Sequence, residues 1–568
     1  MANPRTVKPA GGRAQAPSRP RREGRAPRLY CRARPIANRR MSVVALPVAR
    51  SDELFGHPKG LYVCFLTEMW ERFSFYGMKA LLLLYLVKHH LFGDADGYNL
   101  VGAYGGLVYA TPVIGGLLAD RYLGMRKAVV FGGLLLVLGH LGMAIEGRQA
   151  TVVDGVVVRD GFALQALYFS LALIVTGVGF LKPNISTIVG KLYAENDPRR
   201  DSGFSLFYAG INLGATIAGV LCGWLGETYG WGWGFGVAGV GMLAGLVNFL
   251  YGQKHLHGHA EPPAPARLRE RVLGPLTREQ AIYLGAIGGV VVIWSLVQAH
   301  SLFLKIVPGV FEPSPVLLGM HLVALALLGG ILWFMFARCT RVQRRQMAVV
   351  LVFVTFCLMF FALYMQTYSS WVLFSDRAMN REALGLTWTA GALTSLGAFF
   401  ILVLAPAFAW LWPRLERAGY NPSKPVKAAL GLFLAGASFL VLAWSARHPQ
   451  ANGLAGIGWF VLAYFVLEVG EMLLSPIGLS AVTQLSVPRV VGLMMGGWFL
   501  GLSYSEMLAA ALSKLSAIAV PQDATLDVAA ALAGYDRLFV FSAKIGFLGG
   551  LVALALVPLL KRWMHGVK

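Results

Sequence analysis

Long runs of apolar residues alternate with short polar segments along most of this chain. A helix that crosses a bilayer needs about 20 mostly apolar residues. Six stretches of this kind lie at residues 61–88, 99–119, 127–147, 162–189, 203–226 and 232–251. Two more lie at 280–299 and 316–337, and a further six at 347–375, 387–412, 426–445, 454–480, 490–514 and 538–560. The pattern predicts an all-α membrane protein with fourteen transmembrane helices, grouped as six, two and six.

This grouping predicts four parts in the chain. They are a basic disordered tail at 1–50, a six-helix bundle at 51–252, a linker with two inserted helices at 253–345, and a second six-helix bundle at 346–568. Two six-helix halves related as repeats are the architecture of major-facilitator transporters, whose substrate site lies near mid-membrane between the halves. We therefore expect a major-facilitator fold.

The tail is rich in Arg and Pro and has no apolar segment long enough for a signal peptide. Such an Arg-rich, acid-poor segment can also mimic an organelle transit peptide. We favour two simpler readings, a disordered tail or a start codon placed upstream of a true start at Met41. In each case the segment lies outside the predicted fold.

Composition and charge agree with a membrane protein. Of 568 residues, 56% are hydrophobic and 14% charged, whereas soluble proteins carry about 25% charged residues. Half of the net charge of +22 lies in the first forty residues, where twelve basic residues face one acid, 12 − 1 = +11. Much of the remainder lies in alternate loops, and Lys and Arg mark cytoplasmic loops. We therefore expect an inner (plasma) membrane protein with both termini cytoplasmic, and no nucleic-acid partner.

Motifs for other functions are absent from the sequence. The five cysteines, Cys31, Cys64, Cys222, Cys339 and Cys357, are odd in number and lack metal-ligand spacing. No Ser-His-Asp set, HExxH motif or Gly-rich phosphate loop is present. We expect neither an enzyme nor a bound metal or cofactor, and we disfavour a channel because a paired, asymmetric set of charges suits alternating access better than an open pore.

The first apolar stretch carries Glu68, Glu71, Arg72 and Lys79 at membrane depth. Each unpaired charge near a helix centre costs about 2.5–3.5 kcal/mol on insertion scales. At 100° per residue, Glu68, Arg72, Tyr76 and Lys79 share one face, with Glu71 on its edge. That face should pair internally and line a polar cavity, where burial and basic neighbours oppose each other in setting proton affinity. The alternative is an ion-pair network that only holds helices together.

Six motifs in order give this chain a family resemblance over roughly residues 55–560. They are Glu68-x-x-Glu71-Arg72-Phe73-x-Phe75-Tyr76-Gly77, GLLADRYLGMRK at 116–127, Leu181-Lys182-Pro183-Asn184, FSLFYAGINLGA at 204–215, EMLLSPIGLS at 471–480 and GLMMGGWFL at 492–500. The set resembles the proton-dependent oligopeptide transporters, the POT branch of the major-facilitator superfamily. The resemblance implies proton-driven import of di- and tripeptides.

The resemblance also implies roles for particular residues. Glu68, Glu71, Arg72 and Lys182 would couple transport to protons, although snorkelling toward an interface is an alternative for Lys182. The substrate-binding set would be Arg72, Tyr76, Lys79, Tyr109, Lys182, Asn184, Asn212, Glu471 and Trp498. Lys79, Lys182 and Asn184 would hold a peptide carboxylate, and Glu471, or its neighbour Glu468, the peptide amino group. Tyr109 and Trp498 are equally compatible with plain helix packing.

The sequence departs from the family pattern at several positions. Phe75 replaces a Tyr, and Lys79 stands where many bacterial members have Arg, so that a bidentate grip becomes a point charge. Met365 falls where members often carry Glu, and Gly397 replaces an Asn. These changes lie mainly in the second half and motivate an alternative, a carrier for another small solute such as nitrate, an amino acid or a drug-like compound, working in import or export. For either function we expect a monomer in the bilayer, driven by the proton gradient.

Overall fold

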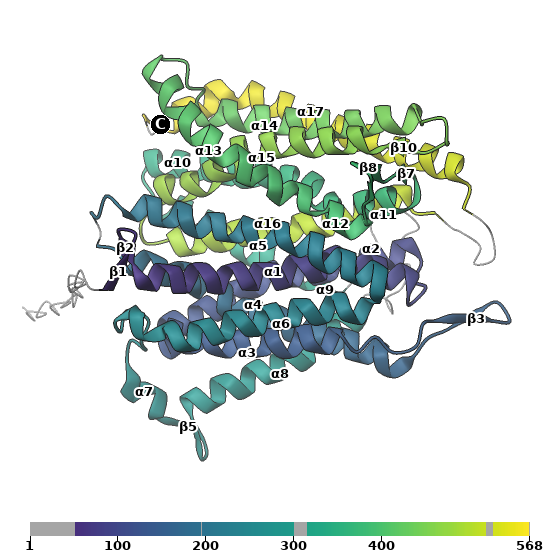
Figure 1. The fold of residues 1–568 in the computed structure, drawn as a ribbon. Coiled ribbons are helices and arrows are strands. Elements are labelled where there is room, and N and C mark those ends of the chain that lie inside the picture. The colour runs from purple at the N-terminus through teal and green to yellow at the C-terminus, as the bar shows by residue number, and fades with distance from the viewer. Residues whose placement is uncertain (1–51, 195, 300–314, 519–525, 567–568) are drawn as a thin grey trace, which may run out of the picture. The chain divides into compact units, whose positions relative to one another are not determined.

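The computed structural model describes residues 52–194, 196–299, 315–518 and 526–566 (Figure 1). The expected tail at 1–50 and the alternative start at Met41 lie outside these residues. Fourteen long helices follow each other in the described parts, as the apolar pattern predicts. The fold class predicted from the sequence is therefore confirmed.

Six helices form the N-terminal bundle: α1 Lys59–Lys88, α2 Asp94–Leu118, α3 Met125–Met143, α4 Gly161–Lys191, α5 Arg200–Tyr229 and α6 Trp231–Gly252. The inserted pair is α8 Arg278–Ala299 and α9 Pro315–Arg338. The C-terminal bundle comprises α10 Arg341–Tyr364, α13 Ser395–Arg417, α14 Lys424–Arg447, α15 Ile457–Leu485, α16 Val491–Ser513 and α17 Val528–Trp563. The four part boundaries drawn from the sequence stay predictions.

Short elements join or extend these helices. A π-helical turn, Ala119–Leu123, continues α2, and the 3₁₀ turns are η3 Gln253–Leu256, η4 Met365–Tyr368 and η5 Lys514–Ser516. Three short helices are α7 Pro265–Arg269, α11 Ser370–Arg377 and α12 Ala390–Leu393. The strands are two- or three-residue pairs: β1 Glu53–Leu54 with β2 His57–Pro58, β3 Thr151–Val153 with β4 Val156–Val158, β5 Arg271–Leu273 with β6 Leu276–Thr277, β8 Glu382–Ala383 with β9 Leu386–Thr387, and, in parallel, β7 Met379–Asn380 with β10 Ala455–Gly456.

Local sequence signals set several helix ends. Asp160 caps α4 by accepting hydrogen bonds from the amides of Phe162 and Ala163, and Asp527 caps α17 in the same way. Thr340 and Gln343 form a reciprocal capping box at the start of α10. Between α5 and α6 the chain turns at Gly230, whose φ of 127° is open to glycine but strained for other residues.

In the described parts of the chain, twelve helices are long and apolar enough to cross a membrane, judged by length and composition. The other two long helices, α1 and α16, carry more polar residues. Every 18-residue window of α1 holds at least three charged residues. The α16 helix is less apolar because it contains Glu506 together with several Gly and Ser residues. Both helices are nevertheless part of the bundles, because α1 packs on α5 and α6, and α16 packs on α2 and α10.

The two bundles contact each other along defined helix pairs. The α2 helix packs on α16, and α5 packs on α12 and α13. Within the N-terminal bundle, small residues bring backbones close, since a Cβ on Gly214 of α5 would lie 2.2 Å from the carbonyl oxygen of Met69 in α1. The inserted α8 lies against α4 and α9 against α16, so each inserted helix adds to the outside of one bundle.

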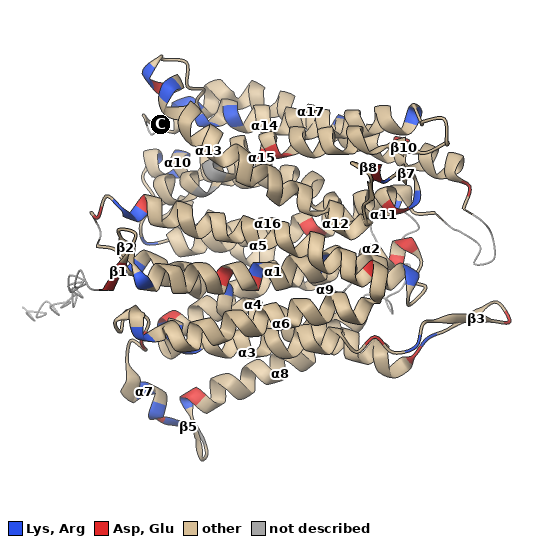
Figure 2. Cartoon of the chain, in the orientation of Figure 1, with Lys and Arg blue, Asp and Glu red and all other residues tan. Residues whose placement is uncertain are grey.

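Of the two ends of the bundles, only one has ion pairs between the bundles among the described residues. Arg377 at the end of α11 binds Asp94 at the start of α2 through two bonds of 2.7 and 2.8 Å. Lys88 at the end of α1 contacts Asp376 at 2.6 Å. At the opposite end, which carries the start of α1 and the end of α17, no ion pair among the described residues links the bundles. Lys and Arg gather at the helix ends on that side (Figure 2).

The Asp94–Arg377 pair should contribute measurably to stability. Its side chains are 4% and 14% exposed, whereas those of Asp536 and Arg447, a pair within the C-terminal bundle, are 23% and 55% exposed. Replacing Arg377 by Ala leaves a buried carboxylate with less compensation, and breaking such a pair costs about 3–5 kcal/mol. Arg447→Ala, the matched control, should cost about 0–1 kcal/mol because water screens an exposed pair.

Thermal unfolding of the detergent-purified variants, followed by tryptophan fluorescence, measures the difference. We expect a clearly lower melting temperature for Arg377→Ala and a nearly unchanged one for Arg447→Ala. Equal shifts would contradict a stabilising link between the bundles at this end.

Candidate functional site

The charged face of α1 is buried, and its members pair with each other. Arg72 donates from Nη2 to Glu71 Oε1 at 2.6 Å and from Nε to Glu71 Oε2. Glu68 Oε1 lies 3.3 Å from the same Nε. The three side chains are between 0% and 4% exposed. One guanidinium thus serves two carboxylates, which leaves this group one negative charge in excess when both are ionised.

Lys79, two turns further along α1, pairs with the opposite bundle. Its Nζ lies 2.5 Å from Oε1 of Glu506 in α16, and both side chains are buried. The same Nζ lies 3.7 Å from Sδ of Met365 and 4.7 Å from the ring centre of Tyr368 in η4. The resemblance implies that Lys79 binds a substrate carboxylate. In this conformation Lys79 is instead paired with the carboxylate of Glu506.

Sequence reasoning missed Glu506, although the signal was available. It is the one acid in the predicted span 490–514, and an ionisable residue inside a transmembrane segment is a candidate functional residue by default. Its cation lies 427 positions earlier in the chain. The pairing of Glu506 with Lys79 therefore depends on how the two bundles pack against each other.

Lys182 in α4 has no carboxylate oxygen within 4.0 Å among the described residues. Its Nζ instead lies 4.5 Å from the ring centre of Tyr109 in α2, a cation–π contact. Glu68 and Glu71 influence Lys182 electrostatically from a greater distance. Asn184, one half-turn on, is buried and donates to the carbonyl of Phe180 at 2.7 Å. Lys182 is thus near the α1 carboxylates without being tied to one of them.

Glu468 and Glu471 are two buried acidic residues of the C-terminal bundle. They lie one turn apart on α15, 0% and 8% exposed, and no cation lies within 4.0 Å of either in the described part of the chain. A Cβ on Gly397 of α13 would lie 2.7 Å from Glu468 Oε1. The carboxylate of Glu468 therefore occupies space that any larger residue at position 397 would need.

The remaining predicted residues differ in their surroundings. Tyr76 stacks on Tyr368 at 5.9 Å between ring centres, which joins α1 to η4 of the opposite bundle. Asn212 is buried and donates to the carbonyl of Tyr208, one turn earlier in α5. Trp498 is buried against α15, where a Cβ on Gly478 would lie 2.2 Å from its ring. The structure thus gives Asn212 and Trp498 contacts of helix packing, whereas Tyr76 spans the two bundles.

Electrostatic contacts place the two halves of this set in one region. Tyr76 interacts with Arg72 and with Glu471. Tyr109, which lies under Lys182, also interacts with Glu471. The arrangement therefore has cations together with Glu68 and Glu71 on the N-terminal bundle, carboxylates on the C-terminal bundle, and tyrosine rings from both. Figure 2 marks the positions of Lys, Arg, Asp and Glu along the ribbon, including those inside the long helices.

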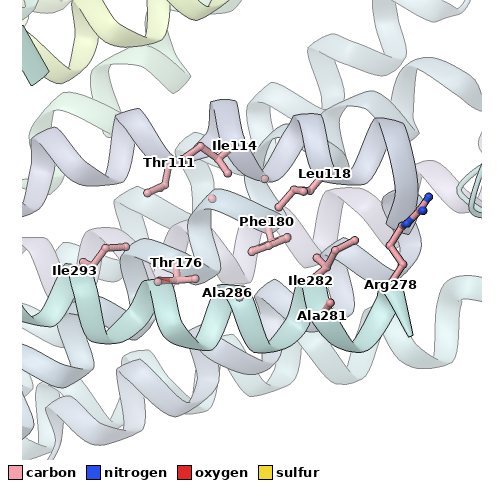
Figure 3. Close-up of a pocket in the computed structure, with 14 residues that line it drawn as sticks. Thr111, Ile114, Leu118, Thr176, Phe180, Arg278, Ala281, Ile282, Ala286 and Ile293 are labelled. Atoms are coloured by element: carbon pink, nitrogen blue, oxygen red, sulfur yellow. The ribbon is translucent and has the colours of Figure 1, made fainter. Parts of the chain in front are cut away.

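A separate cavity of about 410 Å³ lies between α2, α4 and α8 (Figure 3). Its lining is almost wholly apolar, with Ile114, Phe180 and Ile282 on its walls and Arg278 as the charged residue. None of the residues predicted for the site lines it. This cavity belongs to the seam between the inserted helix α8 and the N-terminal bundle, and it lacks the groups needed to recognise a zwitterion.

The described residues hold no group of three or more His, Cys, Asp or Glu side chains that could bind a metal ion. The four described cysteines, Cys64, Cys222, Cys339 and Cys357, are free. The charged and phenolic side chains of the site itself offer ion pairing, hydrogen bonding and proton binding by carboxylates.

A fourteen-helix membrane protein built from two six-helix bundles, with opposed charges buried between them, defines a transporter of the major-facilitator class. Comparison with known proteins agrees and is more specific. The POT family model matches residues 126–525. The chain therefore belongs to the POT family.

Individual relatives support the assignment. The peptide transporter YePEPT of Yersinia enterocolitica is 35% identical over 473 residues, which cover 80% of this chain and 87% of the relative. Dipeptide and tripeptide permease A of Erwinia pyrifoliae is 31% identical over 519 residues, 91% of this chain and 97% of the permease. The crystal structure of a peptide transporter POT in complex with sulfate superposes with a TM-score of 0.73 at 33% identity, covering 90% of this chain and 97% of that one.

The close contact between Glu468 and Gly397 generates a test of the site's geometry. Gly397→Ala should destabilise the protein by about 1–3 kcal/mol, because the added methyl group forces a buried carboxylate to move. In a Glu468→Ala background the same change should cost little. The melting temperatures of the two single variants and of the double variant measure the coupling. Additive shifts would show that Glu468 does not lie against Gly397.

Proposed function

We propose that this protein is a proton-coupled symporter that imports di- and tripeptides by alternating access. Its family and its named relatives are peptide transporters. The observation that carries the proposal is the charge arrangement of the site. Lys182 on one bundle has no carboxylate within ion-pair distance, and Glu471 on the other has no cation, in the described part of the chain.

A short peptide suits such a site. It is a zwitterion whose carboxylate and ammonium group are separated by a length that is set by the number of residues. Cations on one wall and a carboxylate on the other recognise both ends and leave the side chains unread. In this proposal Lys182, with Asn184 beside it, receives the peptide carboxylate and Glu471 the amino group. Tyr76 and Tyr109 lie between them as hydrogen-bond partners for the peptide backbone.

The positions of the ion pairs support alternating access. Basic residues concentrate at the ends of the helices on the side of the start of α1 and the end of α17, and cytoplasmic loops carry such an excess. We therefore assign that side to the cytoplasm of the inner membrane. The ion pairs Asp94–Arg377 and Lys88–Asp376 then close the outer end. This is the arrangement expected of a carrier whose site next opens inward.

The α1 group supports proton coupling. With Glu68 and Glu71 competing for Arg72, one carboxylate can take up a proton without leaving the guanidinium unpaired. A buried carboxylate with a shared counter-ion is the kind of group that binds protons reversibly. Loading this group from the outside and emptying it into the cytoplasm would use the proton gradient, and no other cofactor enters the proposal.

One observation favours an alternative within the same class. Glu468 fills the space beside Gly397 and gives the C-terminal bundle a second carboxylate next to Glu471. A carrier for another small cationic or zwitterionic solute would also use such a pair. Each chain contains the whole set of residues, so a monomer suffices for either function.

Uptake by proteoliposomes tests the proposal. Under an imposed pH gradient, acid outside, the purified protein should accumulate labelled dialanine. Glu71→Gln should lower this accumulation by about 10²-fold or more, because the α1 group loses a proton-binding carboxylate. Counterflow exchange of dialanine, which needs no net proton movement, should be partly retained.

Glu382→Gln, in the exposed β8 strand, is the matched control and should behave like the unmodified protein. If the unmodified protein accumulates another solute but not dialanine, the alternative carrier function is correct. If Glu71→Gln loses exchange and accumulation equally, the role of Glu71 is structural.

The proposed contact with the peptide amino group gives a second prediction. Glu471→Ala should weaken competition by dialanine much more than competition by N-acetyl-dialanine, since the acetylated peptide has no ammonium group to lose. A charge-assisted hydrogen bond is worth about 1.5–3 kcal/mol, or roughly 10- to 150-fold in affinity. Inhibition of labelled-substrate uptake by each peptide measures the ratio. An equal loss for both peptides would place the amino group elsewhere, and Glu468→Ala tests the neighbouring carboxylate in the same assay.

A further inference from the structure

The ion pair between Lys79 and Glu506 has no part in the mechanism described above. It joins α1 of one bundle to α16 of the other, with 2.5 Å between Nζ and Oε1. The side chains are 2% and 3% exposed. A carboxylate buried to this extent must keep a counter-charge or bind a proton, because an unpaired charge at membrane depth is strongly disfavoured.

The packing around Glu506 is shaped for a carboxylate. A Cβ on Gly105 of α2 would lie 2.6 Å from both the carboxyl carbon and Oε2 of Glu506, so a larger residue there would displace it. One turn earlier on α16, the hydroxyl of Ser503 donates to the carbonyl of Gly106 at 2.5 Å. The α2 and α16 helices therefore approach closely at the position where Glu506 reaches Lys79.

Lys79 is the counter-ion of Glu506, and the other groups around Glu506 come from α2, η4, α1 and α9. From α2, the phenols of Tyr104 and Tyr109 interact with it electrostatically. From η4, Tyr368 lies over Lys79, and the Glu71–Arg72 pair lies further along α1. His321 of α9 contacts Tyr504, two residues from Glu506 and so on another face of α16. Loss of the Lys79 contact therefore leaves Glu506 among phenols and apolar groups.

We propose that Glu506 is a proton-coupling residue, and that it releases Lys79 to join Lys182 at the substrate carboxylate only when it takes up a proton. This inference rests on the proposed function. A substrate carboxylate that binds Lys79 displaces Glu506, and the displaced side chain is neutral only in its protonated form. Substrate and proton therefore each favour the binding of the other. Without substrate, the Lys79–Glu506 pair is neutral as a whole and lets the empty carrier return without a proton.

The pH dependence of substrate affinity tests this coupling. For the purified protein, affinity for dialanine should rise as the pH falls, by up to about tenfold per pH unit for one linked proton. Glu506→Gln should lower that slope by about one proton, because a neutral amide cannot hold Lys79 by charge. Glu382→Gln should leave the slope unchanged. A full slope in Glu506→Gln would overturn the proposal.

A double variant that moves the carboxylate from position 506 to position 365 controls for general damage to the protein. Because Met365 Sδ lies 3.7 Å from Lys79 Nζ, a carboxylate at position 365 can reach the same ammonium group. The double variant Met365→Glu/Glu506→Gln should therefore recover the pH dependence that Glu506→Gln lacks. Recovery supports a role for the charge itself, and a double variant that folds but stays insensitive to pH contradicts it.

Infrared spectroscopy without substrate separates this inference from the proposed function. At neutral pH, Lys79→Gln should gain the C=O band of a protonated carboxyl group, and Lys79→Gln/Glu506→Gln should lack that band. If the band is present while dialanine does not bind the unmodified protein, the peptide assignment is wrong and the proton-coupling role of Glu506 stands. If Lys79→Gln shows no such band, Glu506 does not take up a proton when it loses its cation, and the inference is overturned.

Discussion

The bilayer interior does not tolerate an unpaired charge, and the arrangement of this protein follows from that constraint. Fourteen helices supply the apolar surface that lipid requires, and the charged residues are withdrawn from it into the region between the bundles. Arg72 is shared by Glu68 and Glu71 on the same helix. Lys79 pairs with Glu506 on α16 of the other bundle. The pairing of charges therefore decides both how α1 is held and which groups remain for a ligand.

Carboxylates outnumber cations in this region, and the excess matters for binding. Five carboxylates surround three cations: Glu68, Glu71, Glu468, Glu471 and Glu506 face Arg72, Lys79 and Lys182. The carboxylates in excess can be neutralised by protons or by the ammonium group of a substrate. A symporter needs such unpaired carboxylates. A site whose charges were all paired internally would gain little free energy from binding either a proton or a peptide.

Two departures from the family sequence pattern acquire a physical meaning in the structure. Gly397 lacks the side chain that the family usually has, and the carboxylate of Glu468 fills the space. Met365 brings no charge to Lys79, and the charge arrives from Glu506 on α16 instead. In the second case a negative group stays near its expected region but comes from another helix, and in the first a carboxylate takes the place of a neutral side chain. Such exchanges are hidden from a motif-by-motif reading, since each motif is read separately.

The sequence by itself determined the class of fold, because the length of an apolar run and the position of basic loops are local properties that the bilayer reads directly. It also identified the α1 face, since Glu68 and Arg72 are one turn apart on any helix. Tertiary structure alone decided that Lys79 contacts Glu506, that Lys182 has no close carboxylate among the described residues, and that Asn212 and Trp498 have packing contacts. These outcomes depend on how α1, α2, α4, α15 and α16 meet across hundreds of residues, and no local pattern specifies that.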